Sequence, residues 1–136
     1  MAVRGIHHLG VAVEDLDAAV EAYTRLFGAA VERREAVAEQ GVEAASLRVG
    51  AGRIELLRAL EPDTPVGRFL SRRGPAMHHV ALEVDDVAEE LARLRRLGAE
   101  LIDEQPRRGL FGLQVAFVHP EATGGVLAEL VADGGG

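Results

Sequence analysis

The strongest constraint on this chain is a repeated segment. Residues Ile6–Val13 read IHHLGVAV, and residues Met77–Val84 read MHHVALEV. Each copy is followed by an acidic turn and then by apolar residues at helical spacing. A repeat of this kind indicates two similar modules in tandem, each too short to bury a stable core on its own.

The residue pattern of each half predicts the element order β-α-β-β-β. Helices are expected between Asp15 and Gly28 and between Asp86 and Gly98, because these residues are typical of helix N-caps and C-terminal ends. The remaining strands are expected at 31–36, 42–49 and 53–60 in the first half, and at 100–104, 113–119 and 126–131 in the second. The predicted class is therefore α+β, with two tandem βαβββ modules forming a pseudo-two-fold, partly open β-barrel. The modules cover about 4–60 and 77–132 of a single domain, joined by a linker helix within 61–76.

Composition excludes several kinds of chemistry. All 15 basic residues are Arg, 22 residues are acidic, and the net charge is −7, which argues against nonspecific binding of nucleic acid. The lack of Lys excludes Schiff-base catalysis, and the lack of Cys excludes disulfides and thiolate nucleophiles. No stretch has the character of a membrane span or a signal peptide, so a cytoplasmic protein with no membrane partner is expected.

One His and one Glu recur at matched places in the two halves. Alternation along each repeated strand puts His8 and His79 on the side with small neighbours, and Glu55 and Glu129 each stand alone in an apolar strand. A single such His is more often a hydrogen-bonding partner, and a single such Glu can face water. A buried carboxylate is costly without a cation, however, and the duplication favours a shared site. We therefore expect His8, Glu55, His79 and Glu129 to bind one divalent ion, such as Co, Ni, Zn, Mn or Mg.

The other three histidines are expected to have structural roles. His7 and His78 precede the candidate ligands and so point to the opposite face, where they would pack or cap a helix. His119 is followed by a proline and is expected to shape a turn.

Motifs outside the repeats narrow the range of protein families that the chain resembles. They include Asp63-Thr64-Pro65-Val66 between the halves and the ending from His119-Pro120 to Gly124-Gly125-Val126-Leu127-Ala128-Glu129-Leu130. The chain resembles the vicinal oxygen chelate superfamily, which includes glyoxalase I, extradiol dioxygenases, fosfomycin-resistance enzymes and bleomycin-binding proteins. From about Ile6 to Val131 it resembles the methylmalonyl-CoA epimerase family more narrowly. The resemblance implies His8, His79 and Glu129 as metal ligands with Glu55 as the fourth, an acyl-CoA substrate and a homodimer.

The resemblance also implies a reaction. The two C2 epimers of methylmalonyl-CoA would interconvert as a proton leaves the carbon between thioester and carboxylate and another returns on the opposite face, with a divalent metal stabilising the enolate. Glu129 is the better candidate for one base, and Glu55 could serve as the second. Some family members carry Glu where this chain has Ala44, and alternation turns the adjacent Glu43 to the other face unless a bulge intervenes.

Two alternatives stay open. One is a glyoxalase I-like lyase that acts on a glutathione hemithioacetal, and the other is a non-catalytic ligand-binding member of the superfamily. The loop 107–113 also departs from the family pattern, because Phe111 and Leu113 make it more apolar. This departure bears on how the acyl group or the pantetheine is held.

Overall fold

The structure, a computed structural model, describes residues 3–132. The glycine-rich tail at 133–136, for which the composition predicts disorder, lies outside these residues. The chain divides into two compact units. We call His8–His78 the N-terminal unit, and Met1–His7 together with His79–Gly136 the C-terminal unit. The boundaries fall inside the two repeated strands, β1 (Val3–Ala12) and β5 (Ala76–Val84).

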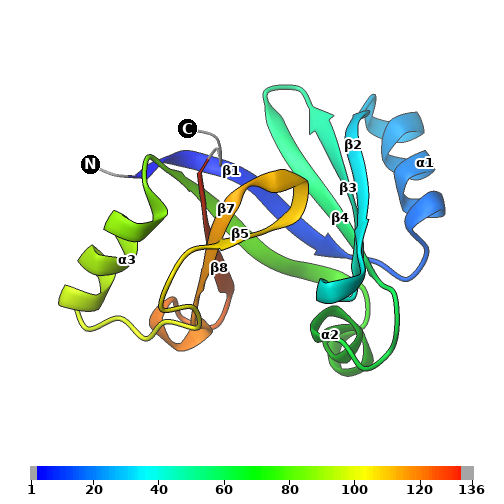
Figure 1. Cartoon of the computed structure of the whole chain (residues 1–136). Coiled ribbons are helices and arrows are strands. Elements are labelled where there is room, and N and C mark those ends of the chain that lie inside the picture. Colours follow the sequence, from blue (N-terminus) through cyan, green and yellow to red (C-terminus); the bar gives the residue numbers. More distant parts are fainter. Residues whose placement is uncertain (1–2, 133–136) are drawn as a thin grey trace. The chain divides into compact units, whose positions relative to one another are not determined.

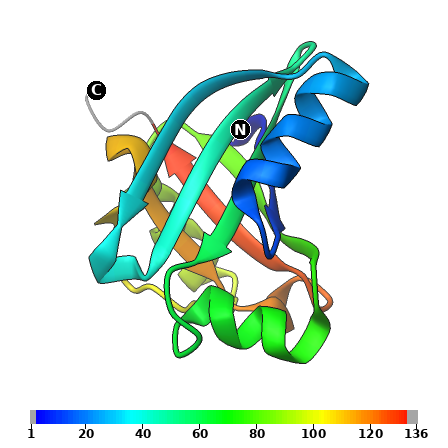
Figure 2. The same ribbon diagram turned by 90° about the vertical axis from the view of Figure 1, so that its right-hand side faces the viewer.

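The N-terminal unit is a four-stranded sheet with one long helix on one face. Its elements after β1 are α1 (Leu16–Phe27), β2 (Ala30–Val37), the 3₁₀ turn η1 (Ala38–Gln40), β3 (Val42–Val49), β4 (Gly52–Ala59) and α2 (Pro65–Arg73). The strand order is β2-β3-β4-β1, with β1 parallel to β4 and the other neighbours antiparallel. Figures 1 and 2 show α1 running along this sheet and α2 beyond the end of β4.

Local sequence explains the limits of α1. The Asp15 carboxylate accepts a hydrogen bond from the Ala18 N–H at 3.0 Å, and Gly28 ends the helix in the left-handed region with φ 67°. The apolar side of α1 packs on alternate residues of the sheet. Their common core contains Leu16, Ala29, Ala45, Leu47 and Leu56.

The C-terminal unit repeats this arrangement around α3. Its elements after β5 are α3 (Val87–Arg96), β6 (Arg107–Arg108), η2 (Leu110–Gly112), β7 (Gln114–Val118), η3 (Pro120–Ala122) and β8 (Leu127–Ala132). The strand order is β5-β8-β7-β6, with β5 parallel to β8. Asp86 caps α3 by accepting from the Glu89 N–H at 3.1 Å. The core beneath α3 is Val84, Val87, Leu91, Ala116, Val118, Ala128, Leu130 and Ala132.

One predicted strand is wrong. Within 100–104, only Leu101 makes an isolated bridge, to Val118, and the strand that pairs with β7 is the two-residue β6 at Arg107–Arg108. The Asp103 carboxylate accepts a hydrogen bond from the Phe117 N–H at 2.8 Å. In a regular strand pair, a backbone carbonyl would be the acceptor of this bond. Pro106 then supplies no N–H donor. Backbone hydrogen bonds from Ile102 and Asp103 to Phe117, and from His119 to Glu100, remain, but the side chain and the proline limit the pairing to one bridge.

The prediction of an α+β chain built from two βαβββ modules is confirmed, with β6 as a short strand of the second module. The linker helix is present as α2 and begins after the N-cap Thr64, whose hydroxyl accepts from the Gly67 N–H at 3.0 Å. Across residues 3–132, no helix has the length and apolar character needed to cross a membrane.

Candidate functional site

In each unit, one face of the sheet is covered by the long helix. We call the opposite face the site face. In the N-terminal unit it carries a buried pair, His8 from β1 and Glu55 from β4, with exposed fractions of 3% and 5%. The His8 Nε2 and the Glu55 Oε2 are 3.5 Å apart. Gly10 is the register partner of Glu55 on β1, so a residue without a side chain lies beside the carboxylate and leaves room for it.

The C-terminal unit carries the matching pair. His79 on β5 and Glu129 on β8 are 3% and 8% exposed, and the His79 Nε2 lies 3.3 Å from the Glu129 Oε1. Ala81 is the register partner of Glu129. In both units the glutamate is therefore the register partner of the small residue two positions after the histidine. The two units thus share the same strand register as well as the same sequence motif.

The donor set of each pair fits a divalent metal. A ligand nitrogen and oxygen that each bind one ion at 2.0–2.2 Å lie about 2.9–3.5 Å apart at octahedral or tetrahedral angles. The separations of 3.5 Å and 3.3 Å fall within this range. Of the predicted ligands, the structure brings His8 to Glu55 and His79 to Glu129, and all four are buried.

Comparison with known proteins decides the family. The model of the Glyoxalase/Bleomycin resistance protein/Dioxygenase superfamily matches residues 7–117. The chain belongs to this superfamily. Its fold is that of the vicinal oxygen chelate proteins, as the resemblance implies.

Within the superfamily, the chain is similar over more than nine-tenths of its length to methylmalonyl-CoA epimerases. It is 34% identical to an ethylmalonyl-CoA/methylmalonyl-CoA epimerase of Cereibacter sphaeroides, over 92% of this chain and 95% of that protein. A solved methylmalonyl-CoA epimerase in complex with methylmalonyl-CoA and NH4+ has a TM-score of 0.94 at 36% identity, covering 98% of this chain and 97% of the other. A Streptomyces coelicolor methylmalonyl-CoA epimerase variant bound to 2-nitronate-propionyl-CoA has a TM-score of 0.92 at 37% identity, with 97% and 99% covered.

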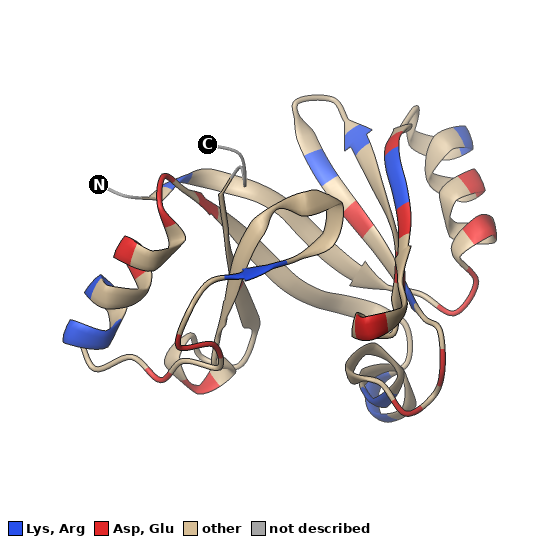
Figure 3. Ribbon diagram, viewed as in Figure 1, with Lys and Arg blue, Asp and Glu red and all other residues tan. Residues whose placement is uncertain are grey.

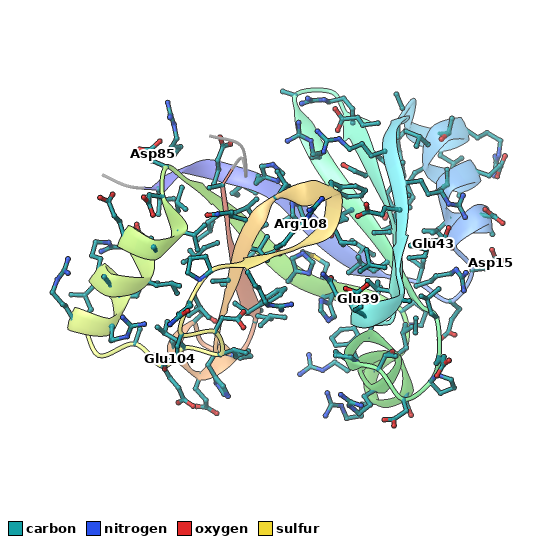
Figure 4. All side chains as sticks on the ribbon, in the orientation of Figure 1. Asp15, Glu39, Glu43, Asp85, Glu104 and Arg108 are labelled. Atoms are coloured by element: carbon teal, nitrogen blue, oxygen red, sulfur yellow. The ribbon has the colours of Figure 1, made fainter. Side chains whose placement is uncertain are left out.

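Glu43, the acidic residue next to Ala44, turns away from the site face. The β3–β4 register is regular from Val42 to Val49, so no bulge changes the alternation there. Glu43 lies near Asp15, the cap of α1 (Figure 4), and its carboxylate binds Arg58 and Arg34 at 2.6 and 3.0 Å. The Arg58 hydrogen bond, followed by that of Arg34, holds the pKa of Glu43 below its usual range. Acidic and basic residues also follow one another along the neighbouring β2 (Figure 3).

On the site face of β3, Ala44 is fully buried and brings no acid. Its neighbour by alternation, Ser46, is 6% exposed and is the register partner of Glu55. The sequence interpretation missed Ser46 as a polar neighbour of the pair. Counting the alternation on from Ala44, together with the hairpin register set at Gly50-Ala51, was enough to find it.

A second missed residue is Phe117, the equivalent of Ser46 in the C-terminal unit. It is the register partner of Glu129, and its ring meets His79 edge-on with centroids 6.0 Å apart. The Arg107 guanidinium lies over this ring, 5.3 Å from its centroid, and also binds Asp103 at 3.2 Å. Aromatic residues in strands are common, so the sequence held no indication that this one borders the pair.

Two of the remaining histidines have the structural roles that the sequence predicts. His78 packs edge-on against Phe69 of α2, with centroids 4.8 Å apart. His119 accepts the Glu121 N–H at 3.0 Å and so caps η3.

Proposed function

We propose that this chain is a methylmalonyl-CoA epimerase that interconverts the C2 epimers of its substrate. The observation that carries the proposal is the pair of buried His–Glu couples at equivalent registers, in a chain similar along its length to such epimerases. A protein that only sequesters ligands has no need of two buried carboxylates, which are costly to desolvate.

The proposed metal ligands are His8, Glu55, His79 and Glu129. Their support is chemical: imidazole nitrogen and carboxylate oxygen suit borderline and hard divalent ions, and His8, His79 and Glu129 are buried residues of these kinds. When bound, such an ion would supply positive charge next to the oxygens of the substrate's thioester and carboxylate. Its identity among Co, Ni, Zn, Mn and Mg is left to metal analysis.

Glu129 and Glu55 are the proposed bases. Epimerisation removes the C2 proton on one face of the carbon and returns one on the other, so it needs a proton acceptor and donor on each side. Glu43 does not fit this role, because its carboxylate faces α1 and is held by two arginines. Glu55 and Glu129 stand at equivalent positions of the two modules, as two bases related by a pseudo-two-fold axis would.

Exchange at C2 tests the proposal. The metal-loaded protein should release deuterium from C2-labelled methylmalonyl-CoA into water and equilibrate the two epimers. The protein should also contain a stoichiometric divalent metal by elemental analysis. Full metal loading without any C2 exchange would reject the epimerase.

A glyoxalase I-like lyase is the second candidate, and the same preparation separates it. It would isomerise a glutathione hemithioacetal to the thioester and leave methylmalonyl-CoA untouched. We further propose that the protein acts as a cytoplasmic homodimer, which size-exclusion chromatography with light scattering would test.

A further inference from the structure

The C-terminal unit surrounds its carboxylate with hydrocarbon. On the site face, Glu129 has Ala81 and Phe117 as cross-strand neighbours, and Val131 follows it on β8. Val131 and Ala81 are fully buried and pack with Val115. His79 and the exposed Glu83, which is the register partner of Val131, are polar side chains of this face. Phe117 stands at the position that Ser46 occupies in the other unit.

The loop between β6 and β7 closes this apolar surface. Leu113, partly buried, packs on Ala81, Val115 and Val131. The loop is fixed in place, because the Gly109 N–H donates to the Leu113 carbonyl at 2.8 Å. Gly109 itself sits so close to Val115 that a Cβ there would lie 2.8 Å from the Val115 Cγ2.

The backbone of this loop is strained. Phe111 has φ 60° and ψ 22°, and among residues 3–132 it is the sole non-glycine residue with positive φ. An L-residue in the left-handed region costs about 1–2 kcal/mol, and such strain persists where the surroundings over-determine it. Because the loop is strained and hydrogen-bonded at its ends, it holds the Leu113 side chain in a fixed position on the apolar surface.

This inference rests on the proposed function, and the chemistry of the substrate indicates which of its groups contacts Leu113. The reacting carbon carries a carboxylate, a thioester carbonyl and an alkyl group. The two oxygen-bearing groups would lose hydrogen bonds against hydrocarbon, whereas the alkyl group gains by burial there. We propose that the C2 alkyl group of a 2-alkylmalonyl-CoA packs on Leu113 beside Glu129, and that Leu113 sets the largest alkyl group accepted.

Substrate preference tests this inference. The ratio of kcat/KM for ethylmalonyl-CoA to that for methylmalonyl-CoA is measured by C2 exchange. Leu113→Ala should raise the ratio about tenfold and Leu113→Phe should lower it by a similar factor, because one methylene in an apolar pocket changes kcat/KM by at least this much. The matched control is Leu110→Ala, which changes the same loop at a residue outside this cluster and should leave the ratio unchanged.

A binding measurement separates this inference from the proposed function. 2,2-Dimethylmalonyl-CoA has no C2 hydrogen and cannot react, so calorimetry reports its affinity without turnover. Leu113→Ser should weaken its binding at least about fivefold relative to that of malonyl-CoA. A wild-type protein that exchanges neither acyl-CoA contradicts the proposed function. Exchange in the wild type with the same ratio in folded Leu113→Ala and Leu113→Phe overturns the role of Leu113 alone.

The smaller change Leu113→Val is the test to use if Leu113→Ala does not fold. It should raise the ratio of kcat/KM for ethylmalonyl-CoA to that for methylmalonyl-CoA by a smaller factor than Leu113→Ala. An unchanged ratio in folded Leu113→Val, with unchanged affinity for 2,2-dimethylmalonyl-CoA, also overturns the inference.

Discussion

The ring of Phe117 meets the imidazole of His79 edge to face, with their planes at 88°. Phe117 is also the register partner of Glu129. One aromatic side chain therefore borders both members of the C-terminal pair, and it limits the orientations that the imidazole can adopt.

Replacing Phe117 should weaken metal binding without removing a ligand. We expect Phe117→Leu to lower the affinity for Co²⁺ or Zn²⁺ about tenfold, since neighbours that orient a ligating histidine contribute effects of this size. Titration calorimetry on the metal-free protein measures the change. Phe69→Leu is the control, because that ring contacts His78 instead. Wild-type affinity in Phe117→Leu would show that the ring does not orient His79.

Removing the imidazole itself should abolish the site. We expect His79→Ala to lose stoichiometric metal, measured by elemental analysis, while its circular dichroism spectrum remains that of the folded protein. His119→Ala is the matched control, because His119 caps η3 and should leave the metal content unchanged. If His79→Ala kept full metal, the proposed ligand set would be wrong.

The two glutamates should act on different epimers. Glu55→Gln keeps an amide oxygen as a possible ligand but loses the base. We expect C2 exchange to fall at least about 100-fold for one epimer and to persist for the other, with the opposite preference in Glu129→Gln. Chiral analysis of partly exchanged substrate measures this asymmetry. Equal losses for both epimers in Glu55→Gln would remove Glu55 as a base for one face.

Glu43 should contribute to stability in a pH-dependent way. Its pKa is lowered chiefly by Arg58 and then by Arg34, so the folded value lies below the unfolded one. The contribution is therefore present above the unfolded pKa and disappears as the pH falls through the folded pKa. We expect Glu43→Gln to lower the free energy of unfolding by about 1 kcal/mol at pH 7 and by less in acid.

Urea unfolding at several pH values measures this effect, and Glu121→Gln, an exposed site on η3, is the control. C2 exchange at pH 7 should be the same in Glu43→Gln and in the wild type, because Glu43 faces α1. A large loss of exchange would instead make Glu43 a base.

Strain at Phe111 can be measured by a pair of substitutions. Both Phe111→Ala and Phe111→Gly remove the ring, but only glycine relieves the positive φ. We expect Phe111→Gly to be more stable than Phe111→Ala by about 1 kcal/mol in urea unfolding. Equal stabilities would mean that the loop relaxes out of the left-handed region.

Local patterns determined most of the fold. The duplicated strands, the caps at Asp15 and Asp86 and the ends of α1 and the linker helix could be predicted, because each depends on residues a few positions apart. Alternation also placed Glu43 and Ala44 on opposite faces, since β3 runs without a bulge. The repeat further made His8, Glu55, His79 and Glu129 stand out as two matched pairs.

Tertiary structure decided those features that depend on contacts between residues far apart in the sequence. The ladder expected at 100–104 is reduced to a single bridge because the Asp103 carboxylate accepts the Phe117 N–H of a distant strand. The neighbours Ser46 and Phe117 follow from the strand register, and the position of Leu113 follows from how its loop packs on Val115. Sequence by itself determined which residues are candidates for the chemistry, because periodicity and caps are local. Only the packed structure decided what surrounds them, because those contacts join residues far apart along the chain.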